Sequence, residues 1–121
     1  MTGMTPIDYF KNATDFVEYE AGATIFEEGN HGHMMYAVKE GAVEIIYKDR
    51  VLETIEAGGF FGEMALIDSE PRSAKAAAKT HCKIVSVDRN RFLFLVQETP
   101  TFALQVMHTL AHRIRVIHEL L

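Results

Sequence analysis

The residues of this chain best suited to bind a small charged ligand are one acid and one base, Glu63 and Arg72. A guanidinium can hold a phosphate through two parallel hydrogen bonds. A carboxylate would repel a phosphate, but it accepts hydrogen bonds from sugar hydroxyls. The pair therefore suits a ligand that carries both a hydroxyl and a phosphate.

The sequence around Glu63 predicts a short helix, a loop and a strand. Residues 62–66 contain good helix formers after a glycine, and Pro71 disfavours helix at Glu70. The start of such a helix leaves backbone N–H groups unpaired, and Gly62 lets a ligand approach the backbone closely. This combination is typical of an anion-binding segment.

Short β-prone runs, most of them ending at glycine, surround this segment. They span about residues 15–20, 24–26, 34–38, 43–47, 51–55, 73–78 and 82–87. Such runs indicate an all-β sandwich or barrel, because glycine readily supplies turn positions with positive φ. Residues 48–50 are typical of a hairpin tip.

Helical patterns flank the β-rich part. Thr5 and Pro6 suit the cap and first turn of a helix over 5–12. Residues 89–98 and 101–121 have apolar side chains at helical spacing. We expect one domain over 1–121, mainly β with flanking helices: a short N-terminal helix, a jelly-roll-like β-roll over about 15–88 with an inserted helix, and C-terminal helices over about 89–121.

The composition limits the classes of protein to consider. The chain has 121 residues, of which 48% are apolar, and a formal net charge of -5. This acidic balance disfavours a large nucleic-acid-binding face. One cysteine, no signal-peptide pattern and no run of 18 apolar residues predict a cytoplasmic protein without membrane insertion.

The segment from Phe61 to Ala74 closely resembles the phosphate-binding cassette of cyclic nucleotide-binding domains. These occur in the catabolite activator protein, the regulatory subunits of cyclic-AMP-dependent kinase and cyclic-nucleotide-gated channels. The cassette pattern is Phe-Gly-Glu-(Leu/Ile)-Ala-Leu, a variable loop, then Pro-Arg-(Ser/Thr/Ala)-Ala, from which Met64 departs mildly. Residues 22–29 and 35–41 look like the family's first hairpins.

The resemblance implies a role for each cassette residue. Glu63 would accept a hydrogen bond from the ribose 2′-hydroxyl, and Arg72 would pair with the exocyclic phosphate oxygens. Backbone N–H groups would hold the rest of the sugar-phosphate. The implied ligand-binding set is Phe61, Gly62, Glu63, Met64, Ala65, Arg72, Ser73 and Ala74.

The contact with the base is implied only in outline. In relatives the last helix often closes over the base, and Arg113, Ile117 and His118 would form that lid here, through apolar contact or by cation stacking. The Ser73 hydroxyl can hydrogen-bond to guanine, but serine also occurs there in domains that prefer cyclic AMP. We favour cyclic AMP over cyclic GMP.

The predicted output is a change in the packing of the C-terminal helices. Transcription-factor relatives continue into a helix-turn-helix domain, whereas this sequence stops at Leu121. We therefore expect a stand-alone sensory module; a nucleotide buffer and a fragment are the alternatives. Ile114, Ile117 and Leu121 predict a homodimer seam or a partner-docking face, or else a lid on the same domain.

Two other functions compete with this one: a degenerate β-roll interaction domain, and a His-based metal or haem sensor. His31 and His33 have the His-x-His spacing of cupins, but that family's accompanying Gly and Glu are missing, which favours an exposed turn. His108 and His112 share a helical face without an obvious further ligand. The sequence also has no P-loop, no Rossmann fingerprint and no nucleophile elbow. We expect no metal, no cofactor and no enzymatic activity.

Overall fold

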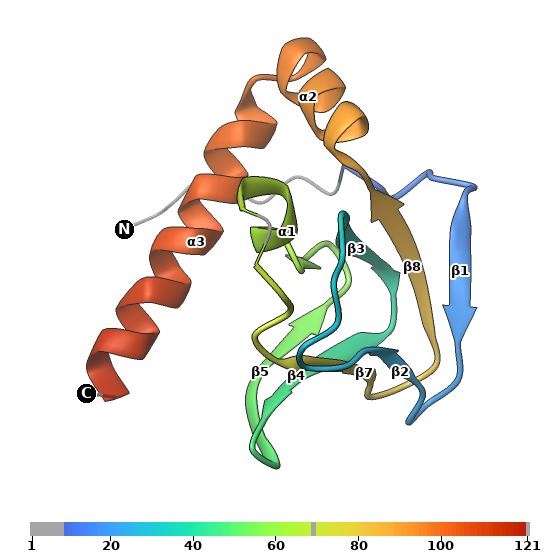
Figure 1. The fold of residues 1–121 in the computed structure, drawn as a ribbon. Helices are drawn as coiled ribbons and strands as arrows, with labels where there is room; N and C mark the ends of the chain where they lie inside the picture. Colours follow the sequence, from blue (N-terminus) through green and yellow to red (C-terminus); the bar gives the residue numbers. More distant parts are fainter. Residues whose placement is uncertain (1–8, 69, 121) are drawn as a thin grey trace. The chain divides into compact units, whose positions relative to one another are not determined.

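The computed structural model describes residues 9–68 and 70–120, and Figure 1 shows their arrangement. In this part of the chain a series of eight short strands, interrupted by one helical turn, precedes two longer helices. The elements are β1 (Phe16–Tyr19), β2 (Thr24–Phe26), β3 (Met35–Glu40), β4 (Ala42–Tyr47), β5 (Arg50–Glu56), β6 (Phe60–Phe61), α1 (Met64–Ile67), β7 (Lys75–Ala78), β8 (Cys82–Val87), α2 (Arg89–Glu98) and α3 (Thr101–Leu120).

The strands form two antiparallel sheets, with the orders β1-β8-β3-β6 and β2-β7-β4-β5. Most connections carry the chain from one sheet to the other, as a rolled-up sheet requires. A core cluster joins them: Val38 and Ile84 come from the first sheet, and Val43 and Ala76 from the second. The predicted mainly-β class is therefore confirmed.

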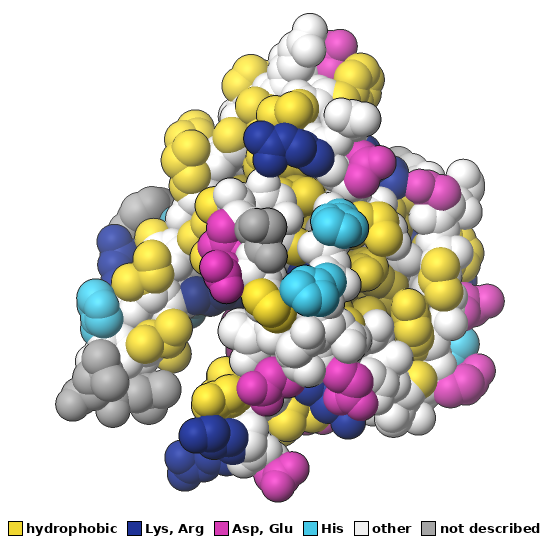
Figure 2. Space-filling view, viewed as in Figure 1, with side chains coloured by type: hydrophobic (Ala, Val, Ile, Leu, Met, Phe, Trp, Pro, Cys, Tyr) yellow, Lys and Arg dark blue, Asp and Glu magenta, His cyan; other side chains and the backbone are white. Residues whose placement is uncertain are grey.

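The β4–β5 hairpin follows the sequence pattern that predicted it. Its tip is Lys48 and Asp49, whose φ angles of 50° and 61° lie in the left-handed region used by two-residue hairpin turns. Figure 2 shows basic side chains at this tip, where Lys48 and Arg50 are exposed. The hairpin lies at an edge of its sheet, because β5 is the last strand in the order.

The chain divides into two compact units, Met1–Arg89 and Asn90–Leu121. In the second unit, α2 and α3 are the helices that the apolar spacing predicted. Thr99 N–H donates to the Leu95 carbonyl (2.8 Å) at the end of α2. The rings of Phe92 and Phe102 meet edge to face, with their centres 5.5 Å apart. None of the described helices has the length and apolar character of a membrane span.

The helix predicted for residues 5–12 lies partly outside the described residues. Its described part, residues 9–12, is a turn rather than a helix. Ala13 N–H donates to the Phe10 carbonyl (3.1 Å), and the Phe10 side chain is buried. Burial of the Phe10 side chain helps to hold this turn against the rest of the domain.

An exposed histidine bridges two glutamates at the end of β1. His81 Nε2 lies 3.0 Å from Glu18 Oε1, and His81 Nδ1 lies 3.6 Å from Glu20 Oε1. The hydrogen bond with Glu18 is the main cause that raises the pKa of His81 above its usual 6.5, and the charges of both glutamates add to it.

We expect this bridge to make a small contribution to stability that depends on pH. Because the folded pKa is raised, the contribution is fully present below pH 6.5 and is lost as the pH rises through the folded pKa. NMR titration of the His81 ring protons measures that pKa, and Glu18→Gln should return it toward 6.5. A wild-type pKa at or below the usual value would contradict this prediction.

Candidate ligand-binding site

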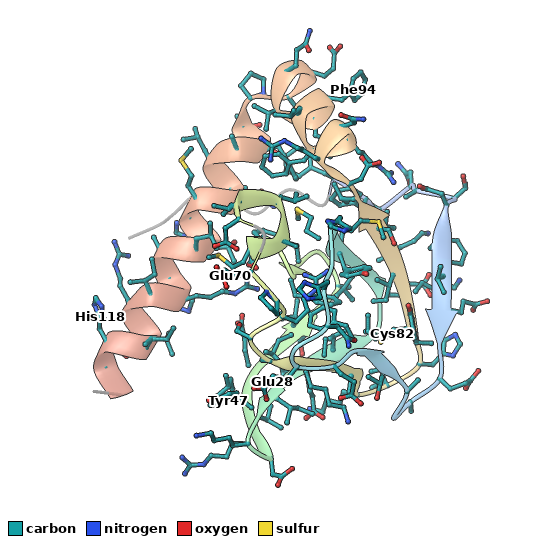
Figure 3. The ribbon with its side chains drawn as sticks, in the orientation of Figure 1. Glu28, Tyr47, Glu70, Cys82, Phe94 and His118 are labelled. Atoms are coloured by element: carbon teal, nitrogen blue, oxygen red, sulfur yellow. The ribbon has the colours of Figure 1, made fainter. Side chains whose placement is uncertain are left out.

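The predicted cassette connects the two sheets. It leaves β6 in the first sheet, passes through α1, and enters β7 in the second. Gly62 has a φ of 75°, a left-handed conformation that favours glycine. Arg89 Nη1 donates to the Leu66 carbonyl (2.9 Å) and so holds the end of α1. The loop that follows carries Glu70, which Figure 3 labels.

Arg72 is the charged centre of this segment. Its side chain is only 8% exposed. Nη1 donates to the Gly62 carbonyl (2.9 Å), and Nη2 donates to the Met34 carbonyl (2.7 Å). The guanidinium carbon also lies 4.3 Å from the centre of the Phe26 ring, a cation–π contact. These contacts fix both the position and the plane of the guanidinium.

The electrostatic environment of Arg72 is unusual for a buried cation. Among the described residues, no carboxylate forms an ion pair with it. Its partners are two neutral carbonyls and two aromatic rings, those of Phe26 and Tyr36. A guanidinium carries five N–H donors, so the two hydrogen bonds to carbonyls leave further donors for an anion. A buried positive charge with this partner set favours a negatively charged ligand.

The segment from Gly29 to Met34 also contacts Arg72, and we call residues 29–34 the arginine loop. Gly29 N–H donates to the Arg72 carbonyl, and Arg72 N–H donates to the Asn30 carbonyl, both at 2.8 Å. The Asn30 side chain in turn accepts a hydrogen bond from Glu27 N–H (2.9 Å). The loop therefore contacts the main chain of Arg72 as well as its guanidinium.

Three aromatic rings support the site from the core of the roll. Phe26, Tyr36 and Phe61 lie with their ring centres 5.4–6.0 Å apart. Phe61 is 1% exposed and pairs with Tyr36 through the short strand β6. Because Phe26 also faces the guanidinium, this cluster links the packing of the core to the position of Arg72.

The other residues of the implied binding set differ in exposure. Glu63 and Ala74 are buried, at 8% and 9% exposed, whereas Met64 and Ser73 are exposed. Ala65 N–H, an implied ligand donor, lies 3.3 Å from the Gly62 carbonyl, a long hydrogen bond within the helical turn. The structure brings Gly62 and Arg72 into direct contact.

The implied base lid lies on α3, in the second unit. Arg113 is partly exposed, and Ile117 and His118 are exposed. Arg113 and Ile117 are four residues apart and therefore share a face of the helix. Their contact with a base stays a prediction.

Sequence reasoning missed Phe26, Gly32 and the Met34 carbonyl as parts of this site. Met34 lies 38 positions from Arg72 in the sequence, and a main-chain carbonyl has no residue-type signal. Gly32 was visible only as the middle of a predicted His-Gly-His turn. His31 and His33 are exposed, as expected, but residues 30–34 form no turn, so the predicted turn is wrong.

The other candidate residues lie elsewhere. His108 and His112 are exposed on α3. The one cysteine, Cys82, is buried, and its Sγ lies within hydrogen-bond distance of the carbonyl oxygens of Ala42 (3.0 Å) and Thr80 (3.1 Å). Within residues 9–68 and 70–120, no group of three or more His, Cys, Asp or Glu side chains has an arrangement that could hold a metal ion.

Comparison with known proteins gives consistent matches. The family model described as cyclic nucleotide-binding domain matches residues 16–99. The cAMP-dependent protein kinase regulatory subunit of Aspergillus fumigatus is 40% identical over 83 residues, which are 67% of this chain and 20% of that protein. The chain thus spans about a fifth of this relative's length.

Two solved structures share the fold. The catabolite activator protein of Thermus thermophilus is 32% identical with a TM-score of 0.71, over 83% of this chain and 50% of that one. A protein from a cyclic-GMP-dependent signalling pathway that regulates bacterial phytopathogenesis is 32% identical with a TM-score of 0.66, over 85% and 84% of the two chains. These neighbours agree with the predicted β-roll.

Proposed function

The chain belongs to the cyclic nucleotide-binding domain family, whose model matches more than half of its length, and we propose that it binds a cyclic nucleotide as a sensory module. The observation that carries this proposal is the buried Arg72 guanidinium, which has no carboxylate partner among the described residues. The cyclic phosphate would supply the missing negative charge, and its exocyclic oxygens would accept hydrogen bonds from two of the remaining N–H donors.

The other cassette residues complete the proposed site. Glu63, buried next to Gly62, accepts from the ribose 2′-hydroxyl. The backbone N–H groups of Gly62, Ala65, Ser73 and Ala74 hold the sugar-phosphate, with Phe61 and Met64 beside them. Arg113, Ile117 and His118 form the lid over the base.

We propose that cyclic AMP binds more tightly than cyclic GMP. The Aspergillus fumigatus relative is named for cAMP. The phytopathogenesis protein belongs to a cyclic-GMP-dependent pathway, so cyclic GMP is the competing ligand. The exposed Ser73 is the cassette side chain whose hydroxyl is available to distinguish the two bases.

The proposed role is regulatory rather than catalytic. Ligand binding shifts the equilibrium between two packings of the C-terminal helices. The size of the shift is set by the difference between the ligand's affinities for the two states. Ile114 and Ile117 of α3 are 53% and 56% exposed, which supports a surface for a second copy or a partner protein. Leu121, the third residue of the predicted seam, lies outside the described residues.

Titration calorimetry with cyclic AMP and cyclic GMP tests the function directly. The protein should first be unfolded and refolded to remove any ligand that co-purifies with it. We expect binding of both nucleotides, with cyclic AMP the tighter. No heat with either nucleotide, together with an unchanged melting temperature, would refute nucleotide binding.

We expect Glu63→Gln to weaken cyclic AMP binding by about ten- to a hundredfold, because hydrogen bonds to charged groups contribute about 1.5–3 kcal/mol. The 2′-deoxy analogue isolates this contact. It should bind the wild type less tightly than cyclic AMP does, whereas Glu63→Gln should bind the two ligands almost equally. Glu56→Gln, which changes an exposed glutamate, serves as the matched control. Full discrimination in the Glu63 variant would assign the ribose contact to another residue.

A further inference from the structure

We propose that Gly32 is a positioning residue for Arg72, and that the absence of a side chain at position 32 sets how tightly the site holds a phosphate. This inference rests on the proposed function, because it concerns the same arginine. It extends the site to the arginine loop, which lies well before the cassette in the sequence.

The first support is the distance between the two residues. A Cβ atom built on Gly32 would lie 2.7 Å from both Cζ and Nε of Arg72, and would also contact Nη2. Carbon atoms in van der Waals contact are about 3.5–4.0 Å apart. A methyl group at this position would therefore push the guanidinium away by about 1 Å.

The second support is the lack of space on the other sides of the guanidinium. The Phe26 ring lies 4.3 Å from Cζ, and the carbonyls of Gly62 and Met34 accept from its two terminal nitrogens. The main chain of Gly62 is also close, since a Cβ built on Gly62 would lie 2.8 Å from Nη1. A shift of about 1 Å is therefore expected to break one or both carbonyl hydrogen bonds, whose range of useful lengths is only about 0.5 Å.

The same geometry predicts that alanine at position 32 changes binding more than folding. Gly32 is not among the glycines with positive φ, so its backbone conformation is open to other residues. The atoms that alanine would displace are the far end of a flexible side chain. Gly62 differs in this respect, because its φ of 75° would add backbone strain to any substitution.

The test compares Gly32→Ala with the wild type in binding and stability. We expect affinity for cyclic AMP to fall by about ten- to a hundredfold, while the urea midpoint falls by a small amount that reflects the lost carbonyl hydrogen bonds. Gly59→Ala is the matched control: its Cβ would lie 2.6 Å from a side-chain atom of buried Ile55, and its φ is not positive. It should lower stability and leave nucleotide affinity almost unchanged.

Two further readouts separate positioning of Arg72 from a general structural effect. In an Arg72→Lys background, Gly32→Ala should cost little additional affinity, because the guanidinium that the alanine would displace is already absent. In the protein without ligand, the Arg72 Nε–H NMR signal should shift in Gly32→Ala and stay in place in Gly59→Ala.

The outcomes are distinguishable. Unchanged affinity in Gly32→Ala, or an equal loss in the Arg72→Lys background, would overturn the role of Gly32 and leave nucleotide binding intact. A wild type that binds neither nucleotide would overturn the proposed function. In that case the Arg72 Nε–H signal, which needs no ligand, still tests the role of Gly32. An unshifted signal in Gly32→Ala would overturn that role.

Discussion

Arg72→Leu is expected to weaken cyclic nucleotide binding by about 30- to 1000-fold, which corresponds to about 2–4 kcal/mol. Arg72 is 8% exposed, and its guanidinium is held by carbonyls rather than by an acid. Leucine removes both the positive charge and the fork of donors, so the phosphate would enter a buried site without a cationic partner. No other substitution in the chain is expected to reduce affinity as much.

Calorimetry on three variants separates charge from geometry. Arg72→Lys keeps the charge and loses the planar fork, so its affinity should lie between those of the wild type and Arg72→Leu. Arg50→Leu removes an exposed arginine at the hairpin tip and should bind as the wild type does. If Arg72→Leu bound cyclic AMP within about threefold of the wild type, the phosphate would not contact this residue.

Phe61→Ala is expected to lower the free energy of unfolding by about 3–5 kcal/mol. Phe61 is 1% exposed and packs against Phe26 and Tyr36, so alanine leaves a cavity between the two sheets. For a domain of this size the loss corresponds to a melting temperature about 10–20 °C lower. Urea denaturation followed by circular dichroism measures it.

The control is the same substitution at an exposed phenylalanine. Phe94, labelled on α2 in Figure 3, is 59% exposed, and Phe94→Ala should change stability by less than about 0.5 kcal/mol. If Phe61→Ala does not fold, Phe61→Leu keeps most of the volume and should cost about 1–2 kcal/mol. Equal effects at positions 61 and 94 would mean that Phe61 is not a core residue in solution.

The sequence predicted the strands well where local signals exist. The hairpin tip at Lys48 and Asp49 combines a turn composition with β-prone residues on both sides, and β8 alternates apolar and polar residues in its first half. The cassette was visible because its charged residues lie within one short segment. Glu63 and Arg72 could therefore be predicted as site residues without any information on contacts between distant segments.

The parts that the sequence did not reveal depend on contacts between distant segments. Strand β6 has only two residues, Phe60 and Phe61, and exists because they pair with Ala37 and Tyr36 of β3. The Met34 carbonyl and Gly32 reach Arg72 only after the sheets have formed. Neither a two-residue strand nor a main-chain acceptor has a periodicity that a sequence pattern can display.

The double attachment of Arg72 has a consequence for the thermodynamics of binding. Its main chain exchanges two hydrogen bonds with Gly29 and Asn30, and its guanidinium is held at both terminal nitrogens. Ordering an arginine side chain costs up to about 2 kcal/mol in rotamer entropy. Because folding already orders this side chain, little of that entropy remains to be lost when a ligand arrives, and a small molecule can bind to it with correspondingly higher affinity.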